Sequence, residues 1–235
     1  SSIYDVPLLM QSEELDSVVL DKLGLSKNSP PELKKWKTFL DRLKNPKAEV
    51  NIALIGKYVE LRDSYKSISE AFIHAGVSNE CKVNVHWIHS DDLDIDNVKK
   101  ELSQMDGVLV APGFGSRGVS GKIDAVQFAR ENLIPFLGIC LGMQCAVIEF
   151  ARNVLNLEDA NTTEIADKTK TPVIAIMEAQ KNISDKGGTM RLGAYSCELK
   201  PNSNIGRAFH SDLISERHPI IFLFKGAHTF TPTRI

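Results

Sequence analysis

Short apolar runs alternate with amphipathic helical patterns through the middle of this 235-residue chain. The runs have the length and composition of buried strands, and several of them close on glycine. Strand-like runs cover 50–56, 82–88, 107–111, 136–139 and 173–177, and helical patterns cover 67–75, 94–105, 122–131 and 143–151. This alternation favours an α/β fold: a doubly wound, mostly parallel sheet with helices on both faces.

In sheets of this kind the functional site lies at the carboxyl ends of the strands. Three segments directly follow predicted strands at that edge: Gly56-Lys57, the turn 113–115, and Cys140. We therefore expect these segments to lie along one crevice.

The segment 135–144, Pro-Phe-Leu-Gly-Ile-Cys-Leu-Gly-Met-Gln, is typical of a strand–turn–helix elbow with a cysteine at its tip. Gly138 and Gly142 flank Cys140 where a tight elbow needs residues without a Cβ. A thiol at this place lies above the free N–H groups of a helix, which favour the thiolate. The pattern predicts that Cys140 is a nucleophile. The alternative is an ordinary buried core cysteine.

A glycine-rich turn, Ala-Pro-Gly-Phe-Gly-Ser-Arg-Gly at 111–118, follows another predicted strand. Such a turn can direct backbone N–H groups at an oxyanion, although a plain turn explains the glycines equally well. The N–H of Leu141, the first after the nucleophile, would be the second donor. Pro112 has no N–H, so the loop would have to use Gly113.

Residues 1–46 have a different character. The apolar segment 6–10 precedes a helical pattern at 13–25 that ends near Gly24, and a second helix is predicted to start at Ser29-Pro-Pro-Glu32 with Ser29 as its cap. Two short helices cannot bury their apolar faces alone, so we expect them to dock on the next domain or to belong to a preceding one. The first residues show neither a starting Met nor a signal pattern, and we expect them to continue a longer chain.

The composition narrows the classes of function. A net charge of −2 speaks against a polyanion-binding surface, so no nucleic acid is expected as partner. The four cysteines form no CxxC pair, which favours a reducing, cytoplasmic compartment. No apolar run approaches the ~18 residues of a spanning helix, and no membrane partner is expected.

The motif Gly-Ile-Cys-Leu-Gly-Met-Gln at 138–144 resembles the nucleophile motif of class I glutamine amidotransferases. Further motifs narrow the resemblance to the glutaminase domain of the CTP synthase family; they are 56–58, 63–65, 113–118, 160–164 and 187–193. The resemblance covers about 1–218. It implies a flavodoxin-like glutaminase domain over 47–218, after the end of a synthetase domain and a helical linker in 1–46.

The resemblance implies hydrolysis of L-glutamine at Cys140. The ammonia would travel to the synthetase domain of the same enzyme, which would aminate UTP to CTP with ATP and Mg²⁺, under activation by GTP, in a homotetramer. No cofactor and no metal site are expected in this chain itself. The glutamine site would be lined by Gly113, Leu141, Gly142, Met143, Gln144 and Glu164.

Glu164 would hold the amino-acid end of the substrate, because an ammonium group needs a carboxylate; without the motif it would be read as a solvated surface acid. Lys57, Arg117 and Arg191 lie in segments that the family links to GTP. Taken singly, each of these basic residues would be read as a solvated surface charge.

One part of the family pattern is missing. Family members take the proton from the cysteine with a histidine of a His-Pro-Glu segment, which a glutamate orients. The resemblance stops after His218, and 219–235 contain no His-Pro-Glu and read as an unrelated tail. His218 belongs by position to a basic run, and His228 has no acidic residue two positions on. We expect an incomplete domain and an impaired glutaminase.

Two other functions remain open. One is a non-catalytic module that binds glutamine or GTP or assembles with complete subunits through its charged and N-terminal helices. The other is a different cysteine hydrolase on the same elbow, against which the Gly-Gly-Thr-Met-Arg-Leu-Gly run at 187–193 argues.

Overall fold

The computed structural model describes residues 2–26, 31–175 and 194–217. The chain divides into two compact units. One comprises Ser1–Ile52 and Glu60–His86, and the other comprises Ala53–Val59 and Trp87–Ile235.

A four-stranded sheet carries the functional edge, and its strand order is β2-β1-β3-β4. The strands are β1 (Ala48–Gly56), β2 (Cys81–His89), β3 (Gly107–Val110) and β4 (Phe136–Gly138). Strands β3 and β4 run parallel, with Val108 opposite Phe136 and Val110 opposite Gly138. This is the order of flavodoxin-like sheets, whose sites lie where the order reverses, between β1 and β3. The predicted α/β class is confirmed.

The ends of β1, β3 and β4 lie next to one another in the second unit. The N–H of Ala111 donates to the carbonyl of Ile55 at 2.8 Å, and the N–H of Ile139 donates to that of Val110 at 3.0 Å. The segments that leave these three strands are therefore neighbours, as the sequence predicts.

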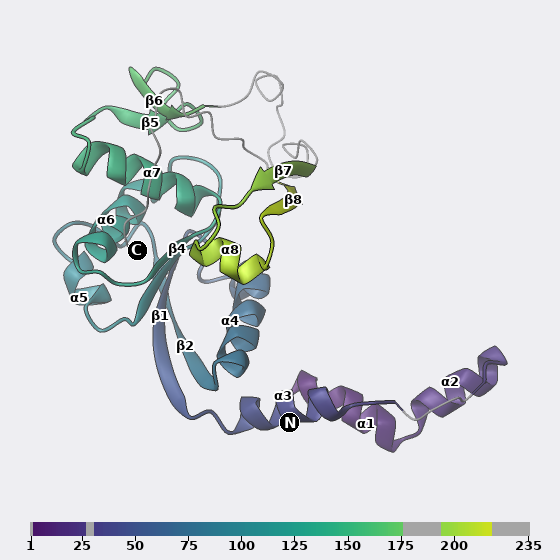
Figure 1. Ribbon diagram of the computed structural model, residues 1–235. Helices are drawn as coiled ribbons and strands as arrows, with labels where there is room; N and C mark the ends of the chain where they lie inside the picture. Colours follow the sequence, from purple (N-terminus) through teal and green to yellow (C-terminus); the bar gives the residue numbers. More distant parts are fainter. Residues whose placement is uncertain (1, 27–30, 176–193, 218–235) are drawn as a thin grey trace. The chain divides into compact units, whose positions relative to one another are not determined.

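Helices α5 (Val98–Leu102), α6 (Val119–Glu131) and α7 (Leu141–Asn153) build the core of the second unit with these strands. Helices α6 and α7 pack on each other and on β3 and β4 (Figure 1). The buried apolar cluster consists of Ala53, Ile55, Leu93, Val98, Leu102, Val108, Val110, Val119, Ile123, Ala125, Val126, Ala129, Leu141, Cys145 and Ile148.

An ion pair fastens α6 to α7. The Nε and Nη2 atoms of Arg130 donate to the carboxylate of Glu149 at 2.7 to 3.1 Å, and Glu149 is only 1% exposed. Three residues further along α7, Arg152 Nε donates to the carbonyl of Ala160 at 2.8 Å and ties the same half of the helix to the next strand. Helix α7 is thus held at two points besides its core contacts.

This ion pair offers a stability prediction with its own control. The exposed Glu131 also contacts Arg130, at 3.3 Å. Because Glu149→Gln leaves the half-buried guanidinium without its buried counter-charge, we expect it to cost about 2 kcal/mol of unfolding free energy, whereas Glu131→Gln costs less than about 0.5 kcal/mol. Urea unfolding of both variants measures the difference, and equal losses would contradict a special role for Glu149.

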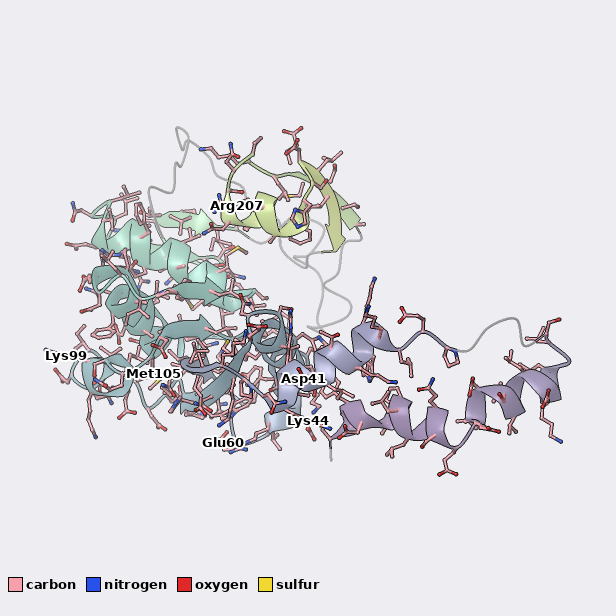
Figure 2. All side chains as sticks on the ribbon, turned by 60° about the horizontal axis from the view of Figure 1, so that its bottom comes forward. Asp41, Lys44, Glu60, Lys99, Met105 and Arg207 are labelled. Atoms are coloured by element: carbon pink, nitrogen blue, oxygen red, sulfur yellow. The ribbon has the colours of Figure 1, made fainter. Side chains whose placement is uncertain are left out.

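Two small sheets follow α7. Strands β5 (Ala160–Thr162) and β6 (Thr171–Ile174) pair in parallel, and β7 (Ala194–Glu198) pairs antiparallel with β8 (Leu213–Arg217) around α8 (Asn204–Phe209). On α8, Arg207 donates to the carbonyl of Asn202 at 2.6 Å (Figure 2). The strand predicted at 173–177 begins earlier and pairs with β5 rather than within the four-stranded sheet; its residues 176–177 lie outside the described residues.

The first unit contains η1 (Ile3–Asp5), α1 (Val6–Ser12), α2 (Leu15–Leu23), α3 (Lys34–Lys44), η2 (Arg62–Tyr65) and α4 (Lys66–Ser78). The ring of Tyr4 packs on Trp36 and Phe39 of α3, and its hydroxyl donates to Glu70 of α4. Lys44, labelled in Figure 2, pairs with Asp5 at 2.6 Å. By contrast, α1 and α2 bury no residue, whereas α3 buries Leu40.

Two helix predictions were wrong at their starts. The helix predicted over 94–105 is only α5, because the Asp94 carboxylate accepts the N–H groups of Asp96 and Asn97 and so holds a turn instead of a helix. Helix α3 begins at Lys34 after an N-cap at Leu33, and Ser29, its predicted cap, lies outside the described residues.

Candidate active site

The predicted elbow is present between β4 and α7. Cys140 is the residue before α7 and has φ 54° and ψ −109°, a conformation that non-glycine residues adopt only when the surroundings enforce it. The enforcing contacts are hydrogen bonds on both sides: Gly142 N–H donates to Ile139 O at 2.9 Å, and Gln144 N–H donates to Cys140 O at 3.1 Å. Backbone strain at a single residue between a strand and a helix is typical of a nucleophile elbow.

Both elbow glycines are required by close backbone contacts. A Cβ added to Gly142 would lie 2.1 Å from the carbonyl oxygen of Val110, and one added to Gly138 would lie 2.5 Å from the carbonyl carbon of Gly142. The sequence prediction for these two positions is confirmed.

The charge state of Cys140 differs from the expected thiolate. Burial raises the pKa of the half-buried thiol, and the carboxylate of Glu164 raises it further, whereas a hydrogen bond from the N–H of Leu141 and the charge of Lys122 lower it. The helix N-terminus does act as predicted, through Leu141, but burial outweighs it. The resting thiol therefore needs a base to take its proton.

Two buried lysines hold the glycine-rich loop in place by donating hydrogen bonds to its carbonyl groups. Lys57 Nζ donates to the carbonyls of Phe114 and Gly115 at 2.8 and 2.6 Å, and Lys122 Nζ donates to the carbonyl of Ala111 at 2.9 Å. Lys57 is 2% exposed and Lys122 is 0% exposed. The reading of Lys57 as a solvated surface charge was wrong.

Gly113 lies close to the side chain of Lys57 and to the ammonium group of Lys122. A Cβ at this position would be 3.5 Å from Cδ of Lys57 and 4.0 Å from Nζ of Lys122. The loop that carries the predicted oxyanion donor is thus fixed by three hydrogen bonds from two side chains, which is the preorganisation that an oxyanion hole requires.

Arg117 continues this loop toward solvent. Its Nη2 donates to the carbonyl of Lys57 at 3.3 Å, its Nε lies 3.5 Å from a carboxylate oxygen of Asp91, and its guanidinium lies 5.9 Å from the ring centroid of Tyr58. The side chain is 61% exposed and remains accessible to a ligand. Arg191, the third residue predicted to be linked to GTP, lies outside the described residues.

Two of the predicted glutamine-binding residues carry buried oxygens that are unsatisfied within the described part of the chain. These atoms are Oε1 of Gln144, on the first turn of α7, and Oε1 of Glu164, after β5. Buried polar atoms are nearly always hydrogen-bonded, so two such oxygens on predicted glutamine-binding residues indicate a place where a polar ligand would bind. Glu164 is near enough to Cys140 to affect its pKa.

The remaining predicted residues lie on the same turn. Leu141 and Gly142 are buried and Met143 is half-buried at the start of α7. Sequence reasoning missed Lys122, although a signal was present: Val119, Lys122 and Val126 are spaced along one face of α6, so the lysine falls on the apolar stripe.

Within the described ranges, three histidines contact residues that are not part of the elbow segment 135–144. His74 lies against Tyr4, His86 against Asn51, and His89 accepts the N–H of Asp91. His210 is the exposed residue that ends α8. His218 and His228 lie outside the described residues.

In the part of the chain that the structure describes, no three or more His, Cys, Asp or Glu side chains form a group that could hold a metal ion. Among the described helices, none has both the length and the apolar character needed to cross a membrane.

Comparison with known families identifies the class of protein to which this fold and this elbow belong. The family model of glutamine amidotransferase class-I matches residues 60–229, and the chain belongs to this family. The sequence is 64% identical to the CTP synthase of Cytophaga hutchinsonii over 217 residues, which are 92% of this chain and 40% of the relative. It is 61% identical to the CTP synthase of Flavobacterium johnsoniae over 218 residues, 93% of this chain and 41% of the relative.

A solved structure agrees with these relatives. The glutaminase domain of Trypanosoma brucei CTPS with bound acivicin superposes with a TM-score of 0.65 at 36% identity, covering 72% of this chain and 66% of that one. The resemblance inferred from the motifs is confirmed. The chain spans about two fifths of the length of the CTP synthases it matches.

Proposed function

We propose that this chain is the glutaminase part of a CTP synthase and that it hydrolyses L-glutamine at Cys140. The observation that carries the proposal is the elbow itself, where Cys140 is held at φ 54° directly before the first turn of α7. The unsatisfied oxygens of Gln144 and Glu164 supply the polar contacts that an amino-acid substrate needs. An apolar elbow pocket for esters would not require them.

The chemistry follows from these positions. The sulfur of Cys140 attacks the carboxamide carbon of glutamine, and the oxygen of the tetrahedral adduct accepts the N–H groups of Leu141 and Gly113. The C–N bond breaks and the nitrogen leaves as ammonia with the proton taken from the thiol. Water then hydrolyses the thioester to glutamate and restores the thiol. Glu164 binds the substrate ammonium, which keeps the carboxamide over the sulfur.

The proposal extends to the whole enzyme only through its relatives. The ammonia would pass to a synthetase domain, where ATP and Mg²⁺ would support amination of UTP to CTP in a cytoplasmic homotetramer. GTP would act on the glutaminase as activator. Arg117, with its exposed guanidinium, fits a contact with such an anion better than Lys57, whose ammonium is bound to two loop carbonyls.

The test uses acivicin, the compound bound in the related glutaminase domain, and mass spectrometry of the cysteine-containing peptides. We expect acivicin to modify Cys140 and L-glutamine to protect it, because both compounds present an ammonium and a carboxylate to the same site. Cys140→Ala should abolish the modification. Cys197→Ala, which removes an exposed thiol from β7, should leave it unchanged.

Two outcomes would contradict the proposal. One is modification of the exposed Cys197 as fast as Cys140, which indicates general thiol reactivity. The other is protection by simple esters but not by L-glutamine, which indicates a different cysteine hydrolase.

A further inference from the structure

Thr162 lies two residues before Glu164 and holds the turn that carries this carboxylate. It is the last residue of β5 and is 1% exposed. Its hydroxyl oxygen accepts the N–H of Glu164 at 3.3 Å, and its carbonyl oxygen accepts the N–H groups of Ile165 and Ala166 at 3.1 and 2.9 Å. A threonine hydroxyl that accepts the N–H two residues further on is typical of a fixed turn. One buried residue thus receives three consecutive N–H groups of the turn 164–166.

The position of Thr162 is itself fixed by the pairing of β5 with β6. Thr162 lies opposite Ile174, and the N–H of the next residue, Thr163, donates to the carbonyl of Ile174 at 3.0 Å. Ile174 is 1% exposed, so this contact belongs to the buried interior. Both strands also pack against α7, the helix that follows Cys140 (Figure 1). Thr162 therefore connects Glu164 to a well-packed part of the second unit.

The base of the loop between β5 and β6 is closed by other hydrogen bonds. The carboxylate of Asp159 accepts the N–H of Lys170 at 2.6 Å, and the hydroxyl of Thr169 donates to the carbonyl of Asp159 at 2.6 Å. These two bonds join the ends of the loop and do not involve Glu164. The bond between the Glu164 N–H and the hydroxyl of Thr162 therefore acts on the orientation of one residue rather than on the closure of the loop.

Glu164 needs this support because its side chain has little of its own. Its Oε1 is buried and has no hydrogen-bond partner within the described residues. The direction of this oxygen then depends on the backbone that carries it, and the N–H of that backbone is bonded to Thr162.

We propose that Thr162 is a positioning residue for substrate recognition, which directs the Glu164 carboxylate at the ammonium group of L-glutamine. The inference rests on the proposed function, because it assumes that Glu164 binds this ammonium group. It adds that affinity for the amino-acid end of the substrate, and not the reactivity of the thiol, depends on the hydroxyl of Thr162.

The experiment measures how well two ligands protect Cys140 of the full chain from alkylation by iodoacetamide, followed by mass spectrometry of its peptide. The ligands are L-glutamine and glutaramate, which is L-glutamine without its ammonium group and so offers Glu164 nothing to bind. The substitution is Thr162→Val, which removes the hydroxyl and keeps a β-branched side chain suited to a strand. We expect the half-protecting concentration of L-glutamine to rise roughly threefold to tenfold, as for one lost hydrogen bond, and that of glutaramate to change by less than about twofold.

Further variants separate positioning from packing. Thr162→Ser keeps the hydroxyl and should restore protection by L-glutamine to within about twofold of the wild-type chain. Thr162→Ala also removes the hydroxyl and gives the same comparison if Thr162→Val does not fold. Thr169→Val removes a hydroxyl from the base of the same loop and should change neither half-protecting concentration by more than about twofold. Without ligand, every variant should be alkylated at the wild-type rate, because the elbow is unchanged.

Three results would overturn the proposal. They are an unchanged affinity for L-glutamine in Thr162→Val, an equal loss for glutaramate, and an equal effect of Thr169→Val. Failure of the proposed function would be seen separately, in the wild-type chain, where L-glutamine would then protect Cys140 no better than glutaramate and acivicin would not modify it.

Discussion

Purified chain is expected to release ammonia from L-glutamine at about 10⁻² s⁻¹ or less. Typical enzymes turn over about 10 times per second, and loss of the general base from a catalytic triad lowers kcat by roughly a thousandfold or more. Here burial raises the pKa of Cys140, so at neutral pH the nucleophile is mostly a thiol that cannot attack without losing its proton. The sequence holds no His-Pro-Glu to accept it. Coupled measurement of glutamate and ammonia gives the rate.

The control for this low rate is the acivicin reaction on the same preparation, which shows that the site is formed. Free imidazole should accelerate glutamine hydrolysis by acting as an external base, and it should have no effect on Cys140→Ala. Turnover near 10 s⁻¹ would contradict the prediction. In that case His218→Ala and His228→Ala would show which histidine supplies the base.

Gly142→Ala is expected to cost about 3 kcal/mol or more of unfolding free energy and to abolish modification of Cys140 by acivicin. The added methyl group would lie 2.1 Å from the carbonyl oxygen of Val110 and 3.1 Å from Cβ of the same residue. Both belong to β3 in the buried core, so neither can move cheaply, and overpacking against backbone is at the costly end of such substitutions. Relief requires α7 to shift away from β3, and Cys140 would move with it. Urea unfolding and acivicin labelling measure the two effects.

Gly24→Ala provides the matched control. Gly24 closes α2 with φ 65° and has open space around its missing Cβ, so its replacement tests backbone strain without a clash. We expect a loss of about 1 kcal/mol and normal labelling of Cys140. If Gly142→Ala behaved like Gly24→Ala, the close contact with Val110 would not be what fixes the elbow.

Much of the fold could be predicted from the sequence because its main helices and strands have strong periodic or apolar patterns. The runs that became β1 and β3 and the patterns that became α4, α6 and α7 were placed to within a few residues. The short β5 has no detectable pattern in three residues, so its pairing with β6 was missed. The side chain of Asp94 accepts backbone N–H groups that a helix would need, and therefore a turn forms where the sequence pattern predicted the start of a helix.

For the site, the motif identified Cys140, Gly138 and Gly142, since their requirements are local to one elbow. The buried lysines could not be derived in the same way. The burial of Lys57 depends on carbonyls 57 and 58 residues further along the chain, and only the fold brings them to its ammonium. The raised pKa of Cys140 likewise results from burial by distant segments and from Glu164, which outweigh the local helix N-terminus.

The attachment of α7 to β5 has a consequence for substrate length. Cys140 precedes this 13-residue helix, and Arg152 near its far end holds Ala160 of β5, the strand that leads to Glu164. On the proposed function, the helix and the strand together therefore fix the separation between the nucleophile and the carboxylate that binds the substrate ammonium. Asparagine, one methylene shorter than glutamine, should be unable to place its carboxamide at Cys140 and its ammonium at Glu164 at once, so selection between the two amides is built into the backbone rather than into a pocket wall.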